Sequence, residues 1–195
     1  MTYVKASVRR PAGNPGNGIQ PKDQLVIYDV DDILYFPPRN EAGVVIEEDI
    51  VMKAGRYAIG IYLTPGTAEI SSNSDGETDA EGYTPSVKFN HPGNEQEIRE
   101  FKTNWLSKKC IVVLRYCSGK PADLIGTPCN PSKLSVSYTG SNESNTNELT
   151  FTQISKGDDI AIYRGTDTLE EPVAVVEAGA TDIDYQTDGQ YQLSA

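Results

Sequence analysis

One histidine and three cysteines are the side chains best suited to nucleophilic catalysis. His91 is the only histidine, and it stands before Pro92 in a predicted turn. The cysteines are Cys110, Cys117 and Cys129, and neither a Gly-x-Ser-x-Gly motif nor a Walker loop occurs in the chain. A cysteine–histidine pair brought together by the fold stays open as an alternative. We nevertheless expect no catalytic residue and no enzyme activity.

The cysteine spacing also bears on disulfide formation. Cys110 and Cys117 bracket the apolar run Ile111 to Tyr116. If that run is one strand, the two cysteines lie on opposite faces, about 23 Å apart. A disulfide needs Cα atoms within about 7 Å, so these two residues do not pair. With an odd third cysteine, the pattern favours buried free thiols in a protein made in a reducing compartment.

Two acidic clusters raise the question of a metal. Residues 29–32 (Asp-Val-Asp-Asp) and 75–81 (Asp-Gly-Glu-Thr-Asp-Ala-Glu) offer oxygen ligands that suit Ca²⁺. Neither cluster has the EF-hand spacing, so we favour solvated acidic turns and expect no metal site. Gly13, Gly16 and Gly18 lie in a proline-rich stretch, neither after a strand nor before a helix, so they predict no phosphate-binding loop and no cofactor.

Charge excludes one class of function. The chain has 195 residues and a formal net charge of −11. A nucleic-acid-binding surface of the usual kind needs a basic footprint, and only Lys5, Arg9 and Arg10 at the start of the chain resemble one. Residues 11–21 are rich in Gly, Pro and Asn, so we expect residues 1–24 to form an extended arm. The chain has no apolar run of about 18 residues and no secretory pattern, which predicts no membrane association.

Segments in which apolar and polar residues alternate predict half-buried strands. These segments are 57–63, 87–89, 134–138 and 149–152. The last two flank the polar stretch 139–148, which predicts a hairpin with a long exposed loop. Residues 110–117 are apolar on both faces, which predicts a central strand.

Turn signals and short apolar runs predict further strands. Asn40 to Gly43 predicts a hairpin between residues 33–36 and 44–46, and Asp188-Gly189 predicts another. Residues 160–163 and 173–176 are short apolar runs that also predict strands. Together these segments predict a mainly β fold, a sandwich or barrel formed by residues 25–195, in which 166–195 adds a hairpin or an arm.

Residues 95–106 break the strand pattern and predict one amphipathic helix. Ile98, Phe101, Trp105 and Leu106 fall on one helical stripe, which we expect to pack on the sheet. Asn94 is the expected N-cap. The helix then leads directly into the central strand.

The order of features over residues 64–165 is similar to that of a known family. Thr64-Pro65-Gly66-Thr67 is followed by an acidic loop (71–82) and Tyr83-Thr84-Pro85-Ser86-Val87-Lys88-Phe89. Next come His91-Pro92-Gly93, the helix and the 110–117 strand. These are followed by Asp123-Leu124-Ile125-Gly126-Thr127-Pro128 and a strand from Leu134. A polar loop and Asn147-Glu148-Leu149-Thr150-Phe151-Thr152 come last. This order, which covers about half the chain, resembles the major tail-tube proteins of long-tailed bacteriophages and their relatives in contractile injection systems.

The resemblance implies a virion structural protein. Such proteins have a β-sandwich or barrel with one flanking helix, and they stack as hexameric rings that form a conduit for DNA. Expected partners are further copies of the chain, other tail proteins (tape measure, terminator and sheath) and DNA in transit. An acidic inner wall would repel phosphate. Residues 1–24 and 36–50 are candidates for bridging rings.

Three other functions stay open from the residues alone. One is another phage component, such as a tail terminator, connector or head decoration protein. The second is a carbohydrate-binding β-sandwich, because the chain has 11 tyrosines whose rings can stack on sugars. The third is an intracellular enzyme of unrecognised type.

Overall fold

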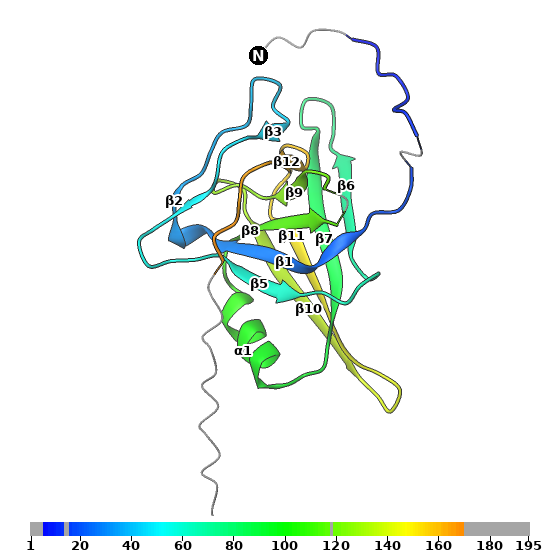
Figure 1. Cartoon of the computed structure of the whole chain (residues 1–195), viewed down its shortest axis with the longest axis vertical. Helices are drawn as coiled ribbons and strands as arrows, with labels where there is room; N and C mark the ends of the chain where they lie inside the picture. Colours follow the sequence, from blue (N-terminus) through cyan, green and yellow to red (C-terminus); the bar gives the residue numbers. More distant parts are fainter. Residues whose placement is uncertain (1–5, 14–15, 118, 170–195) are drawn as a thin grey trace, which may run out of the picture.

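The computed structural model describes residues 6–13, 16–117 and 119–169. The hairpin expected at Asp188-Gly189 and the strand expected at 173–176 lie outside this part. The described residues confirm a mainly β fold with one helix. Ten of its strands form one continuous sheet that folds into two layers, described below as a six-stranded and a four-stranded sheet, which lie face to face (Figure 1) and join where Ser132 pairs with Cys110.

The first sheet has six strands in the order β5-β1-β8-β9-β12-β3. Every neighbouring pair is antiparallel except β12 and β3, which are parallel. Its members are β1 (Pro21–Asp29), β3 (Val45–Ile46), β5 (Ile59–Tyr62), β8 (Cys110–Tyr116), β9 (Ala122–Ile125) and β12 (Ala161–Tyr163).

The second sheet is antiparallel and is built from two hairpins of longer strands, β6–β7 and β10–β11, in the order β6-β7-β11-β10. These are β6 (Glu69–Asp75), β7 (Gly82–Pro92), β10 (Ser132–Gly140) and β11 (Asn145–Gln153). The turn between β6 and β7 requires glycine at position 76, because its φ is +144° and a Cβ there would lie 2.3 Å from the Ala80 carbonyl oxygen.

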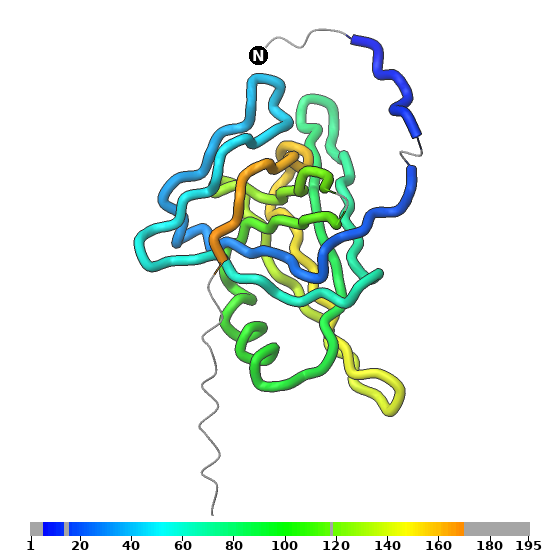
Figure 2. Tube along the Cα trace, viewed as in Figure 1, coloured from blue at the N-terminus to red at the C-terminus, as the bar shows by residue number. Residues whose placement is uncertain are grey.

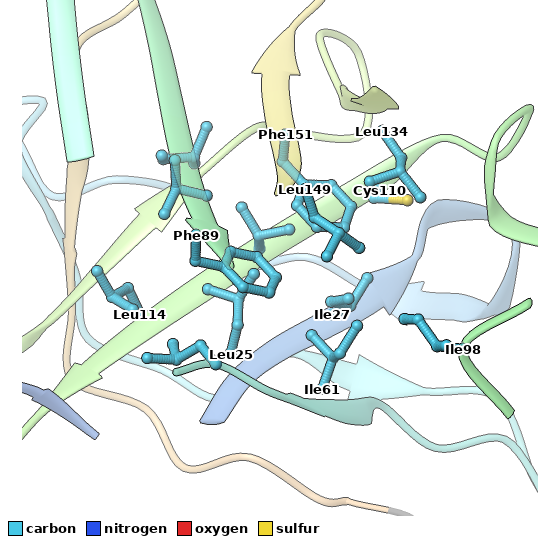
Figure 3. Close-up of a cluster of buried hydrophobic side chains, with 14 of the residues drawn as sticks. Leu25, Ile27, Ile61, Phe89, Ile98, Cys110, Leu114, Leu134, Leu149 and Phe151 are labelled. Carbon is cyan, nitrogen blue, oxygen red and sulfur yellow. The ribbon is translucent and has the colours of Figure 1, made fainter. Parts of the chain in front are cut away.

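A first apolar cluster fills the space between the two sheets (Figure 3). Phe89 and Phe151 stack across it, with ring centroids 6.5 Å apart, and both are fully buried. Facing them is one side of β8, which supplies Cys110, Val112 and Leu114. This cluster is the main core of the protein.

A second apolar cluster covers the opposite face of the six-stranded sheet. Val26, Ile111, Val113 and Tyr163 come from the sheet, and they contact residues of the long segment between β1 and β5. That segment contains a 3₁₀ turn (Val30–Asp32), β3 and a small two-stranded sheet of β2 (Ile33–Tyr35) and β4 (Val51–Met52). Strand β8 is therefore buried on both faces, which confirms the prediction for residues 110–117.

Helix α1 (Gln96–Trp105) confirms the one predicted helix and closes one side of the sandwich (Figure 1). Ile98 is buried, and Phe101 and Trp105 pack against the main core. Leu106 was predicted to share this stripe but is 54% exposed, because it lies at the C-cap beyond the packed turns. The predicted N-cap at Asn94 is also wrong, since the cap is Glu95 and it makes no side-chain hydrogen bond.

Three of the predicted strand arrangements are wrong. The turn at Asn40 to Gly43 forms, but β2 pairs with β4 and β3 pairs with β12, so no hairpin joins 33–36 to 44–46. Residues 71–75 of the expected acidic loop (71–82) belong to strand β6, whereas the strand predicted at 87–89 is confirmed as part of the eleven-residue β7. The 134–152 hairpin is confirmed, but its loop is only 141–144.

Candidate assembly surface

The four-stranded sheet presents an almost entirely polar face to solvent. Alternate residues of its strands fill the main core, so the remaining residues point outward. Apart from Gly82 and Pro92, every outward residue is hydroxylated, an amide or charged. They are Glu69, Ser71, Asn73, Asp75, Thr84, Ser86, Lys88, Asn90, Lys133, Ser135, Ser137, Thr139, Thr146, Glu148, Thr150 and Thr152.

Cross-strand contacts hold this polar face together. The Glu69 carboxylate lies 3.3 Å from the Lys88 ammonium directly opposite, and the hydroxyls of Ser71 and Ser86 are 2.9 Å apart. Three carboxylates and two ammonium groups make the face close to neutral. A wall with so few fixed cations offers a phosphate backbone little to bind.

Both lateral strands of this sheet lack a second ladder partner along most of their length. Within the described residues, β6 pairs only with β7, and β10 pairs only with β11 beyond its single contact at Ser132. Unpaired strand edges are templates for pairing with another chain. The sheet therefore has two sides at which a further copy can be added.

The register identifies which backbone groups point outward at each edge. Gly93 N–H donates to the Asn145 carbonyl, so odd residues of β7 bond to β11 and even ones bond to β6. On β6 this directs the backbone N–H and C=O groups of Ile70, Ser72 and Ser74 to the open side. The same alternation on β10 directs the backbone N–H and C=O groups of Leu134, Val136 and Tyr138 to its open edge.

His91 lies on β7 without a catalytic partner in the described residues. Its ring makes an edge contact with Tyr62, with centroids 6.2 Å apart, and its Nδ1 is buried without a hydrogen bond. Burial lowers the pKa of His91, and the nearby Lys102 ammonium lowers it further. Lys102 donates to Asn94 (2.8 Å) and to Asn147 (2.6 Å), so these polar groups join the helix to the sheet.

All three cysteines are free, but only one of them is buried. Burial raises the pKa of the Cys110 thiol to about 12, which makes it a poor nucleophile. Cys117 and Cys129 are exposed, so the expectation that the thiols are buried is wrong for these two. Cys117 follows the last residue of β8, where its Sγ lies 3.5 Å from the Pro21 carbonyl oxygen.

The acidic clusters are used in local structure. Asp29 caps the 3₁₀ turn and pairs with Lys108, and Asp32 pairs with Arg56. Asp75 lies 3.0 Å from Lys156, whose hydrogen bond lowers the pKa of that carboxyl. In the part of the chain that the structure describes, no three His, Cys, Asp or Glu side chains converge as metal ligands.

The described part of the N-terminal arm lies apart from the sandwich (Figure 2). Its first backbone contact with the body is the Gln20 carbonyl, which accepts a hydrogen bond from Cys117 N–H. Strand β1 then begins at Pro21, inside the range expected for the arm. Arg9 and Arg10 are exposed, and Lys5 lies outside the described residues.

No protein-family model matches the chain, and neither a search of curated proteins nor a search of solved structures finds a match. None of the helices in the described residues has the length and apolar character needed to span a membrane. Function therefore has to be inferred from the residues and their arrangement.

Proposed function

We propose that this protein is a structural subunit of a phage-type tail tube, in which copies associate laterally into rings and the rings stack. The observation that carries the proposal is the four-stranded sheet, with its polar outer face and two unpaired edges. Ring closure needs a head-to-tail contact between two different surfaces of one subunit, and β6 and β10 are two such surfaces.

Pairing of strand edges between copies would place the polar face of the four-stranded sheet on the inside of the ring. When β6 of one copy lies beside β10 of the next, the four-stranded sheets become one continuous wall. The polar face then lines the inside of the ring, while the six-stranded sheet and the second apolar cluster lie outside it. Serine and threonine side chains keep this wall wettable without holding DNA.

The net charge supports the same role. The chain carries −11, yet the polar face itself is nearly neutral, so most of the negative charge lies elsewhere on each subunit. The field of the assembled ring still disfavours retention of a polyanion. Passage of DNA requires low affinity despite close contact, and the net negative charge with few cations on the polar face supports low affinity.

Negative-stain microscopy of the full chain at high concentration tests the proposal through one edge variant. Ser74→Pro removes an N–H that points to the open side of β6, so it leaves every hydrogen bond between β6 and β7 intact. Rings or filaments are expected for the natural chain and for the matched control Ser74→Ala. The proline variant should stay monomeric with an unchanged circular dichroism spectrum.

Two outcomes contradict the proposal. One is a natural chain that stays monomeric under all conditions, especially if a glycan raises its melting temperature, which favours the carbohydrate-binding alternative. The other is normal assembly of the Ser74→Pro variant, because pairing at β6 then plays no part in it.

A further inference from the structure

A groove on the flank of the six-stranded sheet has apolar walls and a basic rim. It has a volume of about 470 Å³ and lies where the arm joins the body. Ile19, Tyr116, Pro121 and Ile162 supply its apolar surface, and the exposed Lys120 stands beside them. The Asp123 carboxylate also lines the groove, but it accepts a hydrogen bond from the Tyr116 hydroxyl.

The end of the chain has the complementary composition. Residues 170–195, which lie outside the described part, contain the apolar run Val173-Ala174-Val175-Val176. They contain no lysine or arginine, and their carboxylates are those of Glu170, Glu171, Glu177, Asp182, Asp184 and Asp188. By contrast, residues 1–20 contain three basic residues and no acid. An apolar run flanked by acids suits an apolar groove that has Lys120 at its rim and is continuous with the basic N-terminal arm.

The chain leaves the described part at a well-anchored point. Asp167 forms an ion pair with Arg115 and accepts a 2.6 Å hydrogen bond from the Tyr28 hydroxyl. Leu169 forms a parallel bridge to Ala58, which the register places next to Tyr28 on β1. This exit point therefore lies near the C-terminal end of β1.

The groove lies near the other end of β1, where Pro21 pairs with Tyr116. Tyr28 follows Pro21 by seven residues, so at the rise of a β-strand the two lie about 23 Å apart along β1. The two sites also lie on opposite faces of the sheet. Leu169 packs in the second apolar cluster, whereas Ile162 alternates with Ala161 and Tyr163 of that cluster and so faces the other way.

The C-terminal run of the same chain is too short to reach this groove. Val173 and Val176 follow Leu169 by four and seven residues, so a fully extended chain spans about 14 to 25 Å. That length barely covers the distance along β1 and leaves nothing for the path around the sheet. A second copy, whose exit point is free to approach the groove, does not face this limit.

We infer that the groove binds the C-terminal segment of a neighbouring copy, with the apolar run 173–176 inside and its acidic flanks against Lys120 at the rim. The inference rests on the self-association in the proposed function and names one contact that holds successive copies together. It makes the two oppositely charged ends of the chain a complementary pair.

Disulfide trapping between full-length chains tests this contact. In a background of Cys117→Ser and Cys129→Ser, protein carrying Asn17→Cys, at an exposed residue that lines the groove, is mixed with protein carrying Val175→Cys and oxidised. Residues held together by binding react at millimolar effective concentration, so at micromolar protein the disulfide-linked dimer should exceed the control at least about tenfold. The control replaces Asn17→Cys by Leu106→Cys, another exposed site, on the end of α1.

The chemistry of the contact gives a second measurement. Val173→Ser with Val176→Ser removes the apolar part, and Glu170→Lys with Glu171→Lys reverses the acidic flank. Each pair of changes should lower the dimer yield several-fold, and high salt should lower the yield of the unaltered segment.

Yields equal to the Leu106→Cys control overturn the inference. Cross-linking within one chain that carries both cysteines, without dimers in the mixture, overturns it as well. Rings without cross-links remove the inference and leave the proposed function, whereas cross-links without rings or filaments remove the proposed function and leave the contact.

Discussion

The central strand of the six-stranded sheet, β8, is buried on both faces, whereas the four-stranded sheet covers the core with one face and presents polar side chains on the other. Along β8 nearly every side chain is buried, and along β11 burial alternates residue by residue. A strand buried twice has no surface left for a partner. The contrast therefore separates the doubly covered strands that hold the fold from a sheet whose outer face and strand edges are open to solvent.

The largest expected effect distinguishes the two faces of the four-stranded sheet. Phe151→Ala opens a cavity between the sheets and should lower the free energy of unfolding by about 4 kcal/mol. Its neighbour Thr150 points to the polar face, so Thr150→Ala should cost less than about 1 kcal/mol. Urea unfolding measures both variants. If both variants lost the same unfolding free energy, the polar face would not be exposed to solvent.

The next effect tests the covered side of the six-stranded sheet. Asp167→Ala leaves the Arg115 guanidinium without its buried partner and should cost about 3 kcal/mol. Glu47→Ala is the matched control, since the Arg164–Glu47 pair is half exposed and should contribute under about 0.5 kcal/mol. If thermal and urea unfolding show similar losses for both variants, the second cluster is not a closed layer.

A smaller effect is expected where the inner face of the four-stranded sheet is polar. The buried Asn147 amide donates to the Gly93 carbonyl at 2.5 Å and accepts from Lys102. Asn147→Ala removes these bonds and should cost about 2 kcal/mol in urea unfolding. Asn142→Ala, in the exposed loop of the same hairpin, should be neutral. A neutral Asn147 variant would show that the helix is held by apolar packing alone.

The smallest expected effect is a pH dependence at His91. Burial lowers its pKa in the folded state below the unfolded value, so its contribution to stability is present above about pH 6.5 and is lost as pH falls below it. The difference in unfolding free energy between the natural chain and His91→Gln should therefore shrink or reverse between pH 7.5 and 5. A constant difference would contradict the buried placement of this ring.

Local pattern was enough to predict several elements. The helix at 95–106, the doubly covered strand at 110–117 and the 134–152 hairpin each depend on periodicity within one continuous stretch. Strand β1 was missed because its first half is polar and its second half is an unbroken apolar run, a pattern typical of no single element. Strand β6 was missed because Ser71 to Asp75 resembles a loop in composition.

The assembly surface was harder to predict than the core. Of the residues considered for chemistry, His91, the cysteines and the acidic clusters are not brought together within the described residues. The polar face consists of residues that attract no notice one by one. The available signal was the alternation of Thr with Leu and Phe in 149–152, and its extension across the neighbouring strands is visible only once their register is known.

By itself, the sequence determined which side chains turn inward, because alternation along a strand depends only on the order of residues in that strand. Tertiary structure alone decided which strands are neighbours and which edges stay unpaired. The turn at Asn40 to Gly43 forms as its residues predict, yet β3 pairs with β12, more than one hundred residues away. Strands pair through backbone N–H and C=O groups, which are nearly the same in every residue, so the choice of partner is made by the packing of the whole core.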